Sequence, residues 1–161
     1  MKKNIVAITG GAGHIGKKIA IDLASQNINV VIIDKVEKNA KKLVENLNKN
    51  KNSNHSYFSA DLSDPKIFQS INLFIKQKYG KLDGLINNAA FYDKIDGWGV
   101  GFDEEGYEAW LKVMQVNLLA PFFLVQSCSS LLKKSKYASV INIASIYSSV
   151  APDPSLYKGT K

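Results

Sequence analysis

Arginine is absent from this 161-residue sequence, and all 21 basic residues are lysines. The guanidinium fork that reads guanine edges is therefore missing, and no aromatic residue is interleaved with the lysine-rich stretch 35–51 to stack on bases. Despite the net charge of +7, we expect this stretch to be the solvent-facing side of a helix, with no nucleic acid as partner.

Cysteine and long apolar runs are also scarce. The single cysteine, Cys128, has no second thiol for a disulfide or a thiolate metal cluster, and we expect it to be a small core residue. Only the short apolar run 5–8 follows Lys2 and Lys3, which argues against a signal peptide. The longest later run, 118–125, is too short to span a bilayer. These features predict a soluble, cytoplasmic protein without a metal site.

The pattern of apolar residues favours one α/β domain over residues 1–161. The composition, 45% hydrophobic and 22% charged, is that of a globular domain. Short apolar runs alternate with stretches of helical periodicity, which is typical of a parallel sheet covered by helices. Strands are expected at 5–9, 30–33, 57–60, 82–87 and 139–144, and helices at 15–24, 40–47, 65–79 and about 105–134. Asp64 is expected to cap the helix at 65–79 and Gly80 to end it, and Pro121 interrupts the helix at 105–134.

A glycine-rich turn, residues 9–16 with the sequence Thr-Gly-Gly-Ala-Gly-His-Ile-Gly, follows the first expected strand. Glycines at such a junction let the backbone approach a pyrophosphate, whose charge is met by the N–H groups of the helix start. Asp34 ends the second strand, 18 residues after Gly16, where a carboxylate can accept hydrogen bonds from both hydroxyls of an adenosine ribose. It would repel a 2′-phosphate, so NAD is preferred over NADP, with the adjacent Lys35 as the residue that would soften this preference. The alternative is an ordinary turn and a surface aspartate.

These motifs resemble the short-chain dehydrogenase/reductase family, and the resemblance runs from Lys3 to the last residue. Four further segments carry it: Ala-Asp-Leu-Ser-Asp at 60–64, Asn-Asn-Ala-Ala at 87–90, Val-Asn-Leu-Leu-Ala-Pro-Phe at 116–122, and Ile-Asn-Ile-Ala-Ser at 141–145. The resemblance implies a Rossmann-like, doubly wound parallel sheet with strand order 3-2-1-4-5. It also implies cofactor contacts from Gly10, Gly13, His14, Ile15, Gly16, Asp34, Asp61, Leu62, Asn88, Ala89 and Ala90, with Asp61 holding the adenine amino group.

The implied chemistry is hydride transfer between NAD(H) and an alcohol or ketone, such as a sugar derivative or a β-keto compound. Ser145 would polarise the substrate oxygen, and a tyrosine whose pKa is lowered by a lysine would transfer the proton. Tyr157 and Lys161 have the required spacing of four residues. A second alignment, to a subgroup with an insertion here, makes Tyr157 a loop residue and places the true pair further along.

Asn117 matches the family's catalytic asparagine, and the sequence supplies a physical reason. Proline has no N–H, so Pro121 leaves the carbonyl four residues earlier, that of Asn117, without its helical donor. A carbonyl freed in this way can hold an ordered water of a proton relay. The alternative is a simple kink that curves the helix.

The family normally continues with further helices and strands, which this sequence lacks. We therefore expect an N-terminal portion whose fifth strand is an edge, belonging to a longer protein that forms a homodimer or homotetramer through the long helix. The alternative is a truncated product that does not turn over. Because Gly10, Gly13 and Gly16 have the spacing of the sugar-nucleotide epimerase branch, an NAD-dependent epimerase or dehydratase stays open, as does a non-catalytic dinucleotide-binding module.

Overall fold

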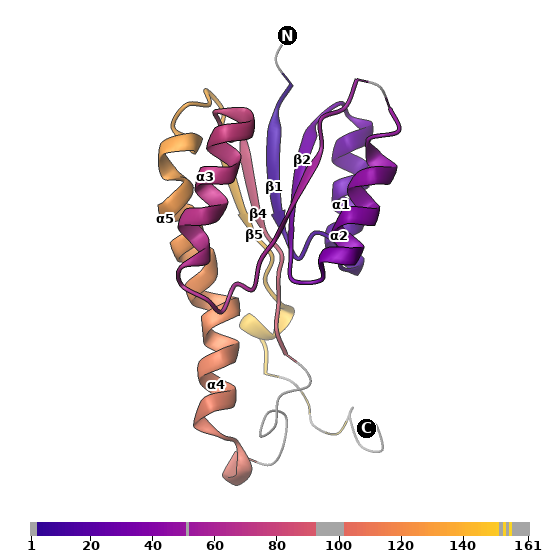
Figure 1. Ribbon diagram of the computed structural model, residues 1–161. Coiled ribbons are helices and arrows are strands. Elements are labelled where there is room, and N and C mark those ends of the chain that lie inside the picture. Colours follow the sequence, from indigo (N-terminus) through magenta and orange to yellow (C-terminus); the bar gives the residue numbers. More distant parts are fainter. Residues whose placement is uncertain (1–2, 51, 93–101, 152, 154, 156–161) are drawn as a thin grey trace.

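The structure, a computed structural model, describes residues 3–50, 52–92, 102–151, 153 and 155. It contains a five-stranded sheet with helices on both faces (Figure 1). The strands are β1 (Ile5–Thr9), β2 (Asn29–Asp34), β3 (Ser56–Ser59), β4 (Gly84–Asn87) and β5 (Ser139–Asn142). The helices are α1 (His14–Ser25), α2 (Glu37–Leu47), α3 (Ile67–Tyr79), α4 (Tyr107–Met114) and α5 (Ala120–Leu132), with a π-helical turn η2 (Gln115–Leu119) between the last two and 3-10 turns η1 (Phe102–Glu104) and η3 (Ile146–Ser148).

The sheet has the order β3-β2-β1-β4-β5, and all neighbouring strands are parallel. The predicted strand order and the Rossmann-like fold class are therefore confirmed. In this register Ile8 lies between Ile32 and Ile86, so the carboxyl ends of the strands meet at one edge of the sheet. The central strands are buried on both faces, which is why they read as continuous β-branched runs in the sequence.

Two apolar cores lie on opposite faces of the sheet. Helices α1 and α2 cover one face, and α3 and α5 cover the other (Figure 1). Alternate residues of β2 serve the two cores: Val30 and Ile32 pack toward α1 and α2, and Val31 and Ile33 toward α3 and α5. Cys128 lies fully buried in the second core, where burial raises the pKa of its thiol to about 11. The expectation of a core cysteine is confirmed.

Several element boundaries differ from those expected from sequence. Helix α2 begins at Glu37, three residues early, and α3 begins at Ile67 because Asp64 caps a separate turn before it, accepting a hydrogen bond from the Lys66 amide at 2.9 Å. Pro65 therefore lies outside the helix. Gly80 ends α3 as predicted, in a left-handed conformation with φ of 76°. Strands β4 and β5 are shorter than expected, because each extends only where its neighbour pairs with it.

The expected long helix is present and runs from Tyr107 to Leu132. Over these 26 residues it is long and apolar enough to cross a membrane by length and composition, which the inspection of 118–125 alone did not reveal. Ala120, Leu124 and Leu131 are buried in the core with α3 and the sheet, but only 22% of the apolar window is buried, and Leu118 and Phe122 are exposed. Helix α4 extends past the carboxyl edge of the sheet (Figure 1).

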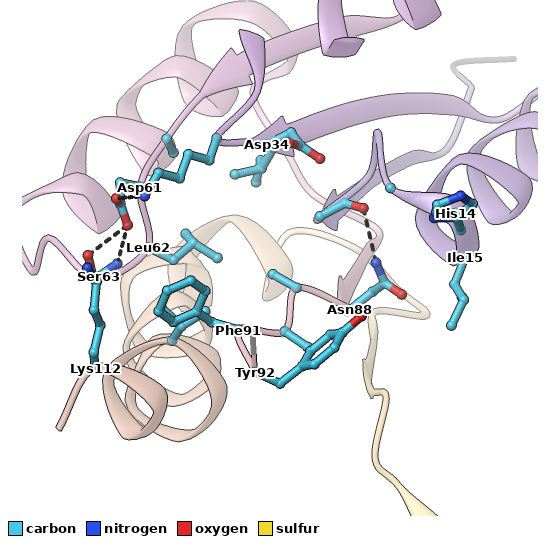
Figure 2. A pocket seen from close by; sticks show the side chains of 18 residues that line it. His14, Ile15, Asp34, Asp61, Leu62, Ser63, Asn88, Phe91, Tyr92 and Lys112 are labelled. Atoms are coloured by element: carbon cyan, nitrogen blue, oxygen red, sulfur yellow. Dashed lines mark hydrogen bonds and ion pairs between the residues drawn. The ribbon is translucent and has the colours of Figure 1, made fainter. Parts of the chain in front are cut away.

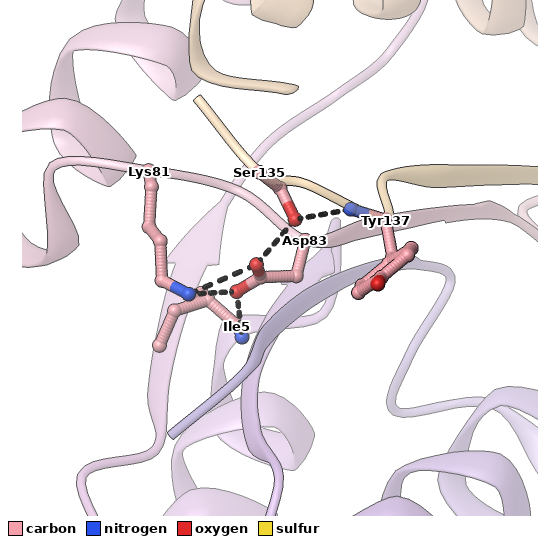
Figure 3. A network of polar contacts seen from close by, with 5 residues as sticks. All are labelled: Ile5, Lys81, Asp83, Ser135 and Tyr137. Atoms are coloured by element: carbon pink, nitrogen blue, oxygen red, sulfur yellow. Dashed lines mark hydrogen bonds and ion pairs between the residues drawn. The ribbon is translucent and has the colours of Figure 1, made fainter. Parts of the chain in front are cut away.

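A polar network fastens the opposite, amino edge of the sheet (Figure 3). The carboxylate of Asp83, before β4, accepts hydrogen bonds from the Ile5 amide at 2.8 Å and the Ser135 hydroxyl at 2.6 Å. Lys81 adds an ion pair at 2.8 Å, and the side chain of Asp83 is only 10% exposed. Although burial opposes it, these donors lower the pKa of Asp83, so the carboxylate links β1, β4 and the segment before β5 in its ionised form.

Candidate functional site

A cavity of about 360 Å³ opens at the carboxyl edge of the sheet. Figure 2 shows Asp61 near one end, His14 near the other and Asp34 between them. In open α/β sheets, ligands bind in the crevice beyond the carboxyl ends of the strands. Ten of the eleven predicted cofactor-binding residues line this cavity: Gly10, Gly13, His14, Ile15, Asp34, Asp61, Leu62, Asn88, Ala89 and Ala90.

The exception, Gly16, lies behind the turn. A Cβ added to Gly16 would lie 2.3 Å from the carbonyl oxygen of Gly10 and 2.8 Å from Nδ2 of Asn88, so only glycine allows α1 to pack this closely on the turn. Gly10 has φ of 59°, and a Cβ there would lie 2.9 Å from Cα of Ala89. Gly10 and Gly16 therefore allow the turn at residues 9–16 to pack closely against α1 and Ala89. We call this turn the glycine cradle.

The amino end of α1 faces this cradle. Gly13 is the N-cap and has no side chain to bond the first amides, and no acidic residue occupies the first turn. The first N–H groups of a helix have no acceptor within the helix, and the helix dipole adds partial positive charge. Because His14 and Ile15 line the cavity, this end of α1 suits an anionic ligand such as a pyrophosphate.

Thr9 and Asn88 join the loops after β1 and β4. The Thr9 hydroxyl accepts hydrogen bonds from the amides of Asn88 and Ala89, each at 3.0 Å. In return, Nδ2 of Asn88 donates to the carbonyls of Thr9 and Gly10 at 3.0 and 3.1 Å. Ala90 stands where the family has glycine and lines the cavity without disturbing this arrangement. The two loops therefore form one rigid wall.

Asp34 lies at the end of β2 with both carboxylate oxygens oriented by backbone amides. Oδ2 accepts from the Ala12 amide at 2.9 Å, and Oδ1 accepts from the Val36 amide at 2.9 Å. Each oxygen keeps a second lone pair, so the carboxylate can accept two more hydrogen bonds from a ligand. The contact with Ala12 also ties Asp34 to the glycine-rich turn.

Asp61 lies on the loop after β3, at the end of the cavity. Its Oδ1 accepts from the amide and hydroxyl of Ser63 at 3.0 and 2.7 Å, and its Oδ2 forms an ion pair with Lys35 at 2.6 Å. Partial burial raises the pKa of Asp61, but the donors from Lys35 and Ser63 outweigh that effect and lower the pKa to about 2. The group is therefore a carboxylate at any physiological pH.

Asn117 contacts the loop after β4 with its side chain. Oδ1 accepts from the Phe91 amide at 2.8 Å, and Nδ2 donates to the Phe91 carbonyl at 2.9 Å. This paired contact orients the cavity wall, since Phe91 lines the cavity. Asn117 therefore acts on the cavity wall through Phe91 and does not itself line the cavity.

The interruption at Pro121 takes the form of a π-helical turn. The Ala120 amide donates to the carbonyl of Gln115, five residues back, and not to Val116 as an α-helix requires. Pro121 has no amide to donate to Asn117. Two successive carbonyls, those of Val116 and Asn117, thus lose their α-helical donors, one more than the sequence argument predicted. Val116 lines the cavity, so this polar backbone lies beside it.

Of the predicted catalytic residues that the structure describes, neither Asn117 nor Ser145 lines this cavity. Ser145 follows β5 at the same edge of the sheet and is exposed; its Oγ accepts from the Tyr147 amide at 3.2 Å and caps η3. Ser145 does not line the cavity. Tyr157 and Lys161 lie outside the described residues.

Sequence reasoning missed several residues that line the cavity. Ser63 follows Asp61 by two positions, a spacing that signals an Asx turn. Lys112 and Val116 are four residues apart on the long helix, and the ammonium of Lys112 lies 5.5 Å from the centre of the Phe91 ring. Helical spacing could have indicated that these two share a face, but not that this face meets the cavity. The lining residues that were not predicted as cofactor contacts are Ile33, Lys35, Ala60, Ser63, Phe91, Tyr92, Lys112 and Val116, of which the sequence named only Lys35, as a modifier of the cofactor preference.

Comparison with known proteins supports the fold and the family. The chain is 37% identical over 142 residues to the short chain dehydrogenase/reductase dpfgG of Gibberella zeae, covering 86% of this chain and 50% of that protein. It is 27% identical over 154 residues to sorbitol-6-phosphate 2-dehydrogenase of Klebsiella pneumoniae, covering 90% and 53%. A solved short chain dehydrogenase of Escherichia coli CFT073, complexed with NADPH, shares the fold with a TM-score of 0.78 at 24% identity, covering 100% of this chain and 62% of that one.

The chain thus spans about half the length of the curated relatives that it matches. This agrees with the expectation of an N-terminal portion. Residues 4–161 match the family described as short chain dehydrogenase, which extends over nearly the whole sequence. The chain therefore belongs to the short chain dehydrogenase family.

Proposed function

We propose that this chain forms the cofactor-binding part of an NAD-dependent oxidoreductase that transfers a hydride between NAD(H) and an alcohol or ketone. One observation carries the proposal: a glycine cradle at the start of α1, an oriented carboxylate at the end of β2 and another after β3 converge on one cavity. Each is placed by a different strand, so their meeting is a property of the fold and not of one motif.

The cavity residues fit a dinucleotide. The cradle of Gly10 and Gly13 with the first amides of α1 would hold the pyrophosphate, Asp34 the adenosine ribose and Asp61 the amino group of adenine. Asn88 and Ala89 would border the nicotinamide half, because they form the wall beyond the cradle. When bound, the nicotinamide ring supplies or accepts the hydride.

Asp34 supports a preference for NAD over NADP. Its two oxygens are held by backbone amides and still have lone pairs for the ribose hydroxyls, whereas a 2′-phosphate would place negative charge against a carboxylate. The comparisons do not support this preference, since the Escherichia coli CFT073 protein is complexed with NADPH. The preference is therefore argued from Asp34 alone, and Lys35 beside it acts in the other direction.

The main-chain carbonyl of Asn117 is proposed to hold an ordered water of a proton relay. The π-helical turn and Pro121 together remove the α-helical donors of the carbonyls of Val116 and Asn117, and Val116 lines the cavity. Pro121→Ala restores one donor and is expected to lower turnover of the longer protein without changing its affinity for NAD. Equal turnover in the two proteins, measured by absorbance of the reduced nicotinamide, would remove the support for this relay.

Ser145 is proposed to polarise the substrate oxygen. Its hydroxyl lies at the carboxyl edge of the sheet, as such a role requires, but at the end of β5 and outside the described cavity. Tyr157 and Lys161 stay proposed as the proton-transfer pair, with a pair further along the chain as the alternative. A sugar-derived alcohol or ketone is the proposed substrate class, in line with the name of the Klebsiella pneumoniae relative.

Two other functions would behave differently in solution. Gly13 lines the cavity and gives the turn the glycine spacing of sugar-nucleotide epimerases. An epimerase would retain NAD tightly and would show no net reduction of it. A non-catalytic module would bind NAD and show no turnover with any carbonyl compound.

Calorimetric titration of the 161-residue chain with NADH tests the proposal. Saturation at about a hundred times the dissociation constant should stabilise the fold by about 2.7 kcal/mol and raise its melting temperature by about 5–10 °C. Asp34→Asn should weaken binding, whereas Asp22→Asn, on the exposed side of α1 and paired with Lys18, should not. A folded chain that shows neither heat nor thermal protection would refute the dinucleotide site.

A further inference from the structure

A second cavity, of about 270 Å³, opens at the amino edge of the sheet, the upper edge in Figure 1. The last turns of α1 and α2 form its walls, and Lys3 before β1 and His55 before β3 also line it. None of its described lining residues lines the cavity at the carboxyl edge. It is therefore a separate place for a ligand, and its volume is close to the lower end of the range for small-molecule sites, about 300–1,000 Å³.

His55 presents a hydrogen-bond donor to this cavity. The residue is only 5% exposed, and its Nδ1 accepts from the Val30 amide at 3.1 Å. Burial, and after it the charge of Lys3, lowers the pKa of His55, so the imidazole is neutral at physiological pH. A neutral imidazole that accepts through one nitrogen carries its proton on the other, so Nε2 is an N–H donor.

This donor has no partner within the described residues. The hydrogen bonds of the His55 side chain among them end at Nδ1. The only fully enclosed side-chain nitrogen or oxygen without a partner in the described part of the chain is Oδ1 of Asn87, so Nε2 of His55 is not sealed off. Because His55 lines the cavity, Nε2 is open to what the cavity contains.

The surrounding contacts hold the imidazole in place. The His55 amide donates to Oδ1 of Asn48 at 2.9 Å, and the His55 carbonyl accepts from Nδ2 of Asn48 at 3.0 Å. With the Val30 amide on Nδ1, both the backbone and the ring are fixed. The Nε2 donor is therefore oriented before any ligand arrives, which lowers the entropy cost of binding.

Lys3 brings a positive charge to the same cavity. Its ammonium donates to the carbonyl of Asn52 and has two further N–H groups. The effect of this charge on the pKa of His55 indicates that the ammonium lies near the imidazole. Of the described residues that line the cavity none is acidic, so a carboxylate partner for these donors is absent from that set. Two donors of this kind suit an anion and repel a metal cation.

The neighbouring surface adds to the positive charge. Ile28 also lines an adjacent cavity of about 260 Å³, which contains three lysines, Lys81, Lys134 and Lys136. Asp83 is the one acidic residue among its described lining residues, and it is paired with Lys81. This part of the amino edge therefore carries an excess of positive charge, which attracts anions.

We propose that the cavity between α1, α2 and β3 is a binding site for a small oxyanion, the phosphate or carboxylate group of a metabolite. The ammonium of Lys3 and the Nε2–H of His55 donate to its oxygens. The apolar side chains of Ile21, Ile28 and Leu47 line the same cavity and accept the remainder of the ligand. The site lies at the opposite edge of the sheet from the dinucleotide cavity and does not depend on the proposed function.

Imidazole signals in NMR spectra test this site, because the chain has two histidines and each lines a different cavity. The wild-type chain is titrated with sodium phosphate, with sodium acetate and, as the control for screening, with sodium chloride at equal ionic strength and constant pH. The Nε2 signal of His55 and the Val30 amide signal should shift and saturate with phosphate or acetate but not with chloride. Phosphate that enters the glycine cradle is reported by His14 instead.

Two variants remove the donors one at a time. Lys3→Met and His55→Asn should each weaken binding about ten-fold or more, because a hydrogen bond to a charged group is lost. In His55→Asn, the amide oxygen replaces Nδ1 as acceptor for the Val30 amide, whose signal reports binding. Lys49→Met is the matched control: it removes an equal charge from an exposed position after α2 that does not line the cavity, and should weaken binding less than about two-fold.

Each other outcome contradicts the site. If the His55 and Val30 signals respond to phosphate and acetate no more than to chloride, Nε2 donates to water alone and the proposal is wrong. Binding that Lys3→Met weakens no more than Lys49→Met does would overturn it as well. Should His55→Asn fail to fold, the wild-type titration and the two lysine variants still decide the question.

Discussion

Gly16→Ala provides a direct test of how the cradle is built. The added methyl group would lie 2.3 Å from the Gly10 carbonyl oxygen, more than 1 Å short of the ordinary contact distance that begins at 3.4 Å. It would also lie 2.8 Å from Cα of Gly11 and from Nδ2 of Asn88. Since two of these neighbours are backbone atoms, rotation of a side chain cannot relieve the contact, and the turn must move by about 1 Å.

Such overpacking typically costs about 1–3 kcal/mol. For a chain of this size, the melting temperature should fall by about 2–12 °C. A shift of about 1 Å in the turn also moves the amides that would hold the pyrophosphate. Misplacement on this scale can lower a reaction rate on the order of a hundred-fold, and it should weaken cofactor binding for the same geometric reason. We therefore expect Gly16→Ala to lower both thermal stability and NAD affinity.

Gly13→Ala is the matched control. Gly13 has φ of −73° and ψ of 178°, which alanine adopts without strain, and its added Cβ would meet only the Gly10 oxygen at 3.3 Å. Because Gly13 lines the cavity, this variant should keep its melting temperature while losing NAD affinity. Differential scanning calorimetry and titration with NAD measure the two effects. If Gly16→Ala melts and binds as the wild-type chain does, the argument from close packing fails.

Two further predictions concern stability. Asp83→Ala removes the acceptor of the Ile5 amide, the Ser135 hydroxyl and the Lys81 ammonium. In urea titrations it should lower the free energy of unfolding by about 3 kcal/mol, whereas Ser135→Ala should lower it by about 1 kcal/mol. Equal losses in the two variants would contradict the network. Burial and the charge of Lys3 lower the pKa of His55, whose Nδ1 accepts from the Val30 amide at 3.1 Å. Its contribution to stability is therefore complete above about pH 6.5 and is lost as the pH falls through the lowered pKa, and His55→Gln should remove this part of the pH dependence.

Much of the site could be predicted from the sequence because its key residues stand directly after strands. Parallel strands end at one edge, so residues such as Gly10, Asp34 and Asn88 must lie near one another once the strand order is known. The strand order itself was implied by the resemblance to a family, and the core position of Cys128 was expected because a lone cysteine is usually a small core residue. Local chemistry also predicted the end of α3 at Gly80.

Other features depend on packing between segments far apart in the chain. The interruption at Pro121 was predicted, but whether it is a kink or a π-helical turn depends on how α4 and α5 pack, and only the structure shows the Ala120 amide bonded to Gln115. Likewise, the contact of Asn117 with Phe91 joins residues 26 positions apart. No periodicity indicates which residue an exposed side chain will meet.

The sequence by itself determined the elements, the glycine-rich turn and the carboxylates at the strand ends, because these follow from local propensity and from short-range spacing. Only the tertiary structure decided that Lys35 would pair with Asp61, that Lys112 and Val116 would join the cavity wall, and that Ser145 would lie outside it. The physical reason is that such contacts are set by the relative placement of packed elements, which a side chain's own neighbours in sequence do not encode.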